Sequence, residues 1–190
     1  MAEGDATDAV VLVRLNARLQ PLNRGELFED PLDEALQRAG LGSVSGGGSL
    51  TEPRGGIVHC ELEIDLKAPD EAVLQRLVGA LESLGAPKGS VLIDEDGERE
   101  IALGQTEGLA LVLNGADLPA EVYAGNDVNA LIAALEAALG NSLRYMDYWE
   151  GPAETSLYFY GDSFAAMQAA IAPVCAQSAL CGLSRIEQIA

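Results

Sequence analysis

The side chains best suited to chemistry gather in one segment, "VHCELEIDL" at 58–66. It contains His59, which is the only histidine of the chain, next to Cys60. A catalytic Cys–His pair has to meet across space, whereas neighbouring residues of a strand point to opposite faces. The segment therefore does not predict a nucleophilic thiol, and we expect Cys60 to be a small core residue.

Three carboxylates of this segment, Glu61, Glu63 and Asp65, alternate with apolar residues, which predicts a strand with one buried and one charged face. Paired carboxylates perform acid–base catalysis in many enzymes. Arg14 and Arg18 belong to an earlier strand-like segment, and we expect them beside these carboxylates as cross-strand ion pairs. We favour a solvated sheet face, and a carboxylate-dependent enzyme is an alternative.

The sequence offers no recognised metal, cofactor or phosphate-binding motif. Five residues separate Cys175 from Cys181, which is not a zinc-ligand spacing, and the acidic run at 94–100 is not a calcium loop. We therefore expect no metal and no cofactor. Three cysteines without a CxxC pair, and an N-terminal segment without the features of a secretory signal, predict reduced thiols and a cytoplasmic location. No apolar stretch approaches the ~20 residues that span a bilayer, so we expect no membrane segment.

A glycine-rich stretch, "GSVSGGGSLTEPRGG" at 42–56, raises the question of a binding loop. Gly46, Gly47 and Gly48 lie between two expected strands rather than before a helix, so a phosphate loop is disfavoured. Two interpretations stay open: a flexible edge strand with a hairpin, or bare backbone against which another element or a ligand packs. Arg18, directly before the expected loop "LQPLNRGELF", and Arg24, within it, are candidates for holding an anion.

Four aromatic residues form the second candidate binding group. Tyr145 and Trp149 alternate on one expected strand, and Tyr158 and Tyr160 alternate on its neighbour, so the four rings are expected on one sheet face. Such a face suits a binding surface or an interface between the two halves of the chain. The alternative is that the rings only cover the sheet and are largely shielded from solvent.

Hydrophobic periodicity predicts the same order of elements twice, strand–helix–strand–strand–helix–strand. In the first half the expected segments are a strand at 9–19, a helix at 29–40 capped by Asp30, strands at 43–50 and 58–66, a helix at 69–85 and a strand at 89–94. In the second half they are a strand at 108–114, a helix at 126–140, strands at 142–150 and 154–160, a helix at 162–178 and a strand at 183–189. The resulting organisation is a flexible N-terminus at 1–8, a half at 9–94, a hairpin or linker at 95–107 and a half at 108–190.

Short matches at an offset of 98 residues support a duplication. They pair Leu15-Asn16 with Leu113-Asn114, Pro21 with Pro119, and Leu41-Gly42 with Leu139-Gly140. A βαββαβ half resembles the ferredoxin-like superfold, which implies an α+β fold of antiparallel sheets with helices on one face. The resemblance implies no single function, because enzymes, small-molecule sensors, inhibitors and RNA binders all use this superfold.

The charge of the chain limits its partners more strongly than any motif. Thirty acidic against eleven basic residues give a net charge of −19, which repels nucleic acid and anionic membranes and attracts cationic molecules. Our first hypothesis is an acidic, non-catalytic interaction protein that binds a cationic protein, as an inhibitor or an immunity-type neutraliser does. The alternative from another class is a sensor that binds a small anionic ligand between the halves. A homo-oligomer is an open alternative.

Overall fold

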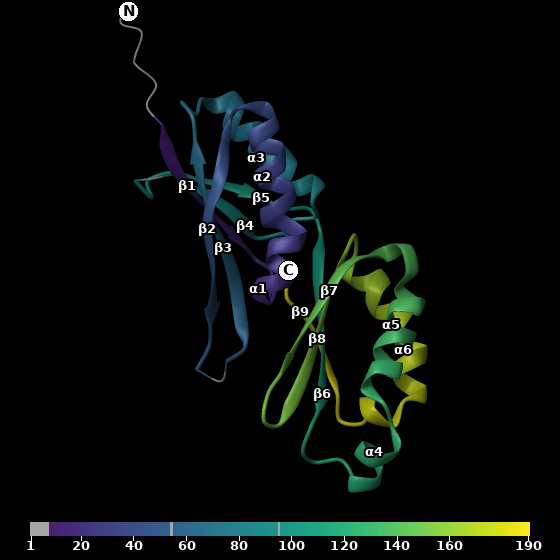
Figure 1. Ribbon diagram of the computed structural model, residues 1–190. Coiled ribbons are helices and arrows are strands. Elements are labelled where there is room, and N and C mark those ends of the chain that lie inside the picture. Colours follow the sequence, from purple (N-terminus) through teal and green to yellow (C-terminus); the bar gives the residue numbers. More distant parts are fainter. Residues whose placement is uncertain (1–7, 54, 95) are drawn as a thin grey trace, which may run out of the picture. The chain divides into compact units, whose positions relative to one another are not determined.

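The computed structural model describes residues 8–53, 55–94 and 96–190 (Figure 1). The chain divides into two compact units, whose main boundary lies between Gln105 and Thr106. Each unit contains one antiparallel sheet and helices, so the mixed α+β class predicted from the sequence is confirmed. Within the described residues, no helix combines the length and the apolar character that crossing a bilayer requires. The predicted flexible N-terminus falls almost wholly on residues 1–7, outside the described part.

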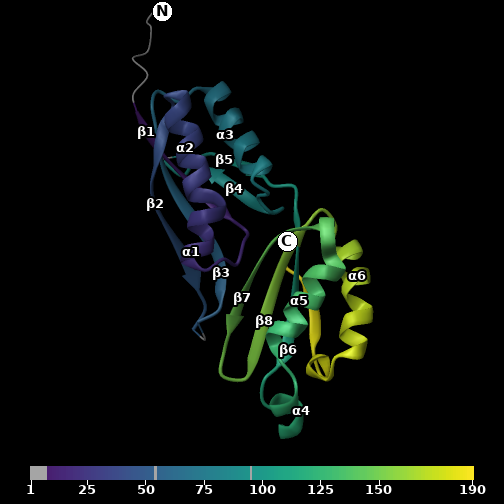
Figure 2. The same ribbon diagram turned by 45° about the vertical axis from the view of Figure 1, so that its right-hand side comes forward.

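The first unit is a five-stranded sheet with the strand order β2-β3-β1-β4-β5. Helices α2 and α3 lie over one face of it (Figures 1 and 2). Leucines such as Leu36 of α2 and Leu77 of α3 are buried against this face. Its elements are β1 (Ala9–Leu15), α1 (Pro21–Arg24), the π-helical turn η1 (Gly25–Glu29), α2 (Asp30–Ala39), β2 (Gly42–Thr51), β3 (Ile57–Leu66), α3 (Glu71–Ser83), β4 (Ser90–Ile93) and β5 (Glu100–Leu103).

Strand β3 has the two faces that its sequence predicts. Cys60, Leu62 and Ile64 are fully buried, and the carboxylates between them lie on the other face. Arg14 of β1 is paired in register with Glu61, and its Nε lies 3.2 Å from Glu61 Oε1. The expected cross-strand ion pair is therefore present.

The prediction that Arg18 also lies on this strand is wrong. β1 ends at Leu15, and the chain then leaves the sheet. Ala17 and Leu19 are nevertheless fully buried, so the alternation of buried and exposed residues continues beyond the last strand residue. Periodicity alone could not reveal where the strand ends, because a half-buried loop here repeats the pattern of a half-buried strand.

The first helical segment begins earlier than predicted. It starts at Pro21, which follows the extended Gln20 and suits the first helical position. Asp30 is therefore not a cap, since its N–H bonds to the carbonyl of Gly25 in the π turn inside a continuous helical segment. The wider π turn ends at Glu29, two residues before Pro31, which has no N–H to donate to the helix. The loop expected at 19–28 is thus helical from Pro21 onward.

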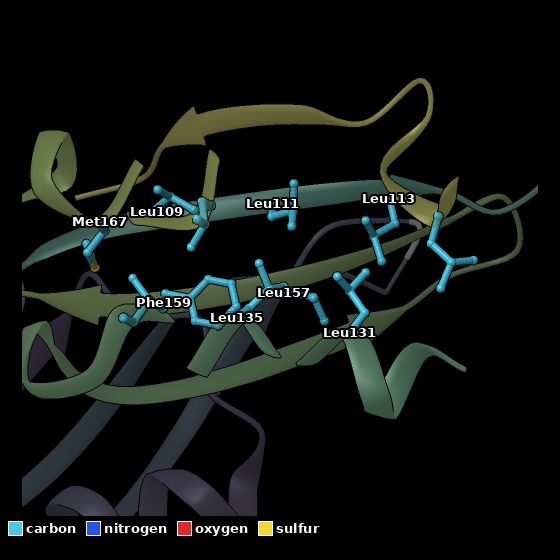
Figure 3. Close-up of a cluster of buried hydrophobic side chains, with 11 residues drawn as sticks. Leu109, Leu111, Leu113, Leu131, Leu135, Leu157, Phe159 and Met167 are labelled. Carbon is cyan, nitrogen blue, oxygen red and sulfur yellow. The ribbon is translucent and has the colours of Figure 1, made fainter. Parts of the chain in front are cut away.

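The second unit is a four-stranded sheet with the order β7-β8-β6-β9. Its elements are β6 (Glu107–Asn114), α4 (Ala120–Gly125), α5 (Val128–Leu139), the 3-10 turn η2 (Gly140–Ser142), β7 (Leu143–Glu150), β8 (Glu154–Gly161), α6 (Phe164–Gln177), the 3-10 turn η3 (Ala179–Cys181) and β9 (Arg185–Gln188). Figure 3 shows the core of the unit, in which side chains of α5 and α6 gather against Leu111, Leu157 and Phe159 of the central strands. The short helix α4 was not predicted.

The segment between the predicted halves forms more structure than a linker. β5 pairs with β4 as an antiparallel hairpin, from Ser90 opposite Leu103 to Ile93 opposite Glu100. The Asp94 N–H bonds to the Arg99 carbonyl, and the Gly97 N–H bonds to the Asp94 carbonyl, which closes the turn. These bonds join β4 and β5 in a β-hairpin, apart from residue 95, which lies outside the described residues.

Candidate ligand pocket and the predicted binding residues

A pocket of about 400 Å³ lies in the second unit, at the first two turns of α5. The sheet supplies the ends of β6, β7 and β8 on the face that carries the leucine core. Helix α4 and the turn η3 close the remaining sides. The lining residues are Leu113, Asn114, Gly115, Tyr123, Val128, Asn129, Ile132, Tyr148, Glu150, Thr155, Leu157 and Leu180.

Strand register explains why these side chains meet. Thr155 of β8 is paired with Leu113 of β6 on one side and with Glu150 of β7 on the other. Tyr148 is paired in the same way with Leu157. Directly paired residues of antiparallel strands point to the same face, so one row of side chains forms the floor of the pocket.

Asn114 builds one wall of the pocket through its own hydrogen bonds. Its Oδ1 accepts from the N–H groups of Ala116 and Asp117 at 3.0 and 2.7 Å, and its Nδ2 donates to Asp117 Oδ2 at 2.9 Å. The Tyr123 hydroxyl, which accepts from the Leu118 N–H at 3.0 Å, packs into the same turn. This amide therefore fixes the loop after β6 and has little capacity left for a ligand.

Three other polar side chains of the lining are available. In the part of the chain that the structure describes, no hydrogen bond or ion pair joins the side chains of Asn129, Glu150 or Thr155 to another residue. Tyr148, whose surface is 46% exposed, lies beside them. The pocket thus offers a carboxylate, a hydroxyl, an amide and an aromatic ring next to an apolar floor.

The segment that builds the pocket is mostly negative in charge. Residues 106–190, all of which are described, contain ten acidic and only two basic residues, a net charge of −8. Both basic residues are already paired: Arg144 Nε lies 3.2 Å from Asp162, and Arg185 lies 2.9 Å from Glu154 and 2.7 Å from Glu187. Residues 106–190 therefore offer no uncommitted cation for an anionic ligand.

The structure places Arg24, a predicted anion-binding residue, inside the first unit. Its side chain is nine-tenths buried, its Nε donates to Glu29 Oε1 at 2.6 Å, and its Nη1 donates to Ser49 Oγ at 2.9 Å. Arg18 lies in the loop after β1 and is half-buried. The charge of Arg24 is thus balanced within the protein.

The glycine run lies in β2, at the edge of the sheet, and Gly47 faces the ion pair of Arg24 and Glu29. A Cβ at Gly47 would lie 2.5 Å from Glu29 Oε1 and 2.9 Å from the carbonyl oxygen of Glu61. At Gly48 a Cβ would meet nothing within 4 Å, and at Gly46 it would lie 3.1 Å from the Glu63 carboxylate. Another element therefore does approach the bare backbone, and it is the first helical segment of the same unit.

The four predicted aromatic residues lie on one face of the second sheet. Tyr145 is paired with Tyr160, and their rings stack with centroids 4.7 Å apart. Tyr145, Tyr158 and Tyr160 are buried, and Trp149 is half-buried. This agrees with the interpretation in which the rings see little solvent, rather than with an open binding surface.

Sequence reasoning missed the pocket residues. Val128 and Tyr148 are large apolar residues that stay exposed, at 37% and 46%. Tyr148 directly precedes Trp149 on β7 and points to the opposite face of the sheet. Within the described residues, no group of three or more His, Cys, Asp or Glu is arranged to hold a metal ion.

Comparison with known proteins gives no family. No protein-family model and no curated protein matches the sequence.

Among solved structures, similarity extends over most of the chain at low identity. An unknown protein from Galdieria sulphuraria is 16% identical, covers 96% of both chains and has a TM-score of 0.29. The regulatory subunit of aspartate kinase from Thermus thermophilus is 11% identical, over 87% of this chain and 91% of that chain, with a TM-score of 0.27. A putative monooxygenase from Lactobacillus acidophilus NCFM is 10% identical, over 96% and 92%, with a TM-score of 0.29. At these scores the similarities carry no argument about fold or function.

Proposed function

We propose that this protein is an acidic, non-catalytic interaction protein that binds a cationic protein partner, in the manner of an inhibitor or a neutraliser. The observation that carries the proposal is the distribution of charge. Residues 1–105 contain 20 acidic and 9 basic residues, and residues 106–190 contain 10 and 2, so both parts are strongly negative. A net negative charge in both parts produces a negative electrostatic potential, which accelerates association with a cationic partner and disfavours association with anionic partners.

The other functions considered from the sequence have less support. An anionic ligand bound by Arg24 would compete with Glu29, which already lies 2.6 Å from the guanidinium. A carboxylate-dependent enzyme would use the β3 carboxylates, but Glu61 is paired with Arg14, and Glu63 and Asp65 are exposed. That arrangement is typical of a solvated sheet face.

Partner capture at two salt concentrations tests the proposal. The tagged full-length chain is incubated with lysate of its own source at about 50 mM and about 500 mM salt, since the Debye length falls severalfold over this range. We expect a stoichiometric, cationic protein that is retained at low salt and lost or strongly reduced at high salt. A partner retained equally at both concentrations, or no stoichiometric partner, would argue against an electrostatic interaction role.

We also propose that the two units are ferredoxin-like βαββαβ halves that arose by duplication. Without β5, the strand order β2-β3-β1-β4 corresponds to β7-β8-β6-β9. The matched pairs Leu15-Asn16 and Leu113-Asn114 lie where β1 and β6 end, at Leu15 and Asn114. Of the matched prolines, Pro21 is the first residue of α1 and Pro119 is the N-cap residue of α4. An experimental structure in which the two sheets and their helices fail to superpose would contradict this proposal.

A cytoplasmic location is part of the same proposal. Cys60, Cys175 and Cys181 are all free thiols, and reduced cysteines are typical of a reducing compartment. Cell fractionation with an antibody against the chain tests this point, and recovery in a secreted fraction would contradict it.

A further inference from the structure

We propose that the pocket at the start of α5 binds a small organic cation, a ligand with an apolar or aromatic body and one ammonium group. The body occupies the apolar floor at Leu113, Ile132 and Leu157, and the ammonium group lies at Glu150. This inference concerns a small molecule and does not depend on the protein partner proposed above.

The size and the lining of the pocket support an apolar body. Its volume of about 400 Å³ falls in the range of ~300–1,000 Å³ that is usual for small-molecule sites. Apolar residues from four different elements line it, and two of its large side chains, Val128 and Tyr148, remain exposed. A ligand that covers these surfaces removes apolar area from water, which favours binding.

The charges that face the pocket select a cation. Glu150 is the one charged residue of the lining, and no described residue neutralises it. The amino end of α5, which would favour an anion, is occupied by Asp127, whose carboxylate accepts from the Asn129 N–H at 2.9 Å. Asp117 lies behind the wall formed by Asn114. All three of these charged groups, Glu150, Asp127 and Asp117, are negative.

The neighbours of Glu150 suit an ammonium group rather than a simple metal cation. Thr155 is its cross-strand partner, so a hydroxyl oxygen lies beside the carboxylate on the same face. The exposed ring of Tyr148 offers a π face to a cation. An ammonium group has three N–H donors, which the carboxylate, the hydroxyl and the amide oxygen of Asn129 can accept.

Three probes with the same indolyl-ethyl body test the charge preference: tryptamine, tryptophol and indole-3-propionate. Each is titrated into the 15N-labelled full-length protein, and amide shifts are followed by NMR. We expect saturable shifts centred on α5 and the β7–β8 hairpin, with tryptamine binding most tightly and indole-3-propionate most weakly. Equal or tighter binding of indole-3-propionate, shifts centred elsewhere, or no binding of any probe at millimolar concentration would overturn the proposal.

Variants locate the ammonium group. Glu150→Gln should weaken tryptamine binding about two- to fivefold, as expected for an exposed charge pair, and leave tryptophol binding unchanged. Glu136→Gln, on the exposed side of α5 and outside the pocket lining, is the matched control and should change neither. Tyr148→Ser should weaken both probes, because it removes part of the pocket wall. Equal effects of Glu150→Gln and Glu136→Gln would overturn the assignment.

Discussion

Nε of Arg24, the residue before the π turn, donates a 2.6 Å hydrogen bond to Oε1 of Glu29, the last residue of that turn. The same carboxylate oxygen occupies the space in which a side chain at Gly47 would begin. A buried ion pair and a glycine in an edge strand are therefore parts of one packing arrangement. The glycine leaves room for the pair, and the pair covers the bare backbone.

Gly47→Ala should destabilise the first unit by about 1–3 kcal/mol, since the new methyl group would overlap with Glu29 and with the backbone oxygen of Glu61. Gly48→Ala is the matched control in the same strand. Its methyl group meets nothing within 4 Å, so we expect a change within about 0.5 kcal/mol or a small stabilisation. Urea unfolding followed by far-UV circular dichroism measures both. Equal effects of the two substitutions would contradict the packing role of Gly47.

The pair itself is tested by a double-mutant cycle with Arg24→Met and Glu29→Gln. Either single change leaves a buried or half-buried polar partner without its charge-assisted hydrogen bond, which should cost about 1–3 kcal/mol of unfolding free energy. The double variant should lose less than the sum of the two, because no unpaired charge remains. Additive losses would show that the two side chains do not stabilise each other.

The sequence predicts which faces are buried better than it predicts where elements end. In β3 the alternation of apolar and acidic residues is followed residue by residue in the structure. In β1 the same alternation misleads, because Ala17 and Leu19 are buried in a loop after the strand has ended at Leu15. Burial repeats every second residue in both cases, but only hydrogen bonds to neighbouring strands define the strand.

The candidate site was harder to predict than the fold. Alternation placed Tyr145, Trp149, Tyr158 and Tyr160 on one face, and their register confirms this. It could not show that three of the rings are buried, because periodicity identifies a face and not what covers it. The pocket was missed because the ends of several elements build it, and those ends meet only through tertiary packing.

Cys175 should react slowly with alkylating reagents. Burial, together with the neighbouring thiol of Cys181, raises the pKa of Cys175 to about 12. A raised thiol pKa keeps the group protonated, and therefore unreactive, at pH 7–9, and its reactivity should increase as the pH rises further. We expect iodoacetamide to label Cys175 in the folded protein at least about tenfold more slowly at pH 8 than in urea, as measured by mass spectrometry of the peptide. Equal rates in the two states would contradict the raised pKa.

Tyr160→Ala should destabilise the second unit by about 3–5 kcal/mol, the usual cost of removing a large buried aromatic ring. Tyr160 is fully buried and stacks on Tyr145, so the substitution removes both burial and a ring contact. Tyr148→Ala is the matched control, because Tyr148 is 46% exposed and should cost clearly less, about 1 kcal/mol or below. The fluorescence of Trp149, the single tryptophan of the chain, reports unfolding of this unit in urea. If the two tyrosine substitutions cost the same, the buried aromatic face of the second sheet would not contribute to stability as the structure indicates.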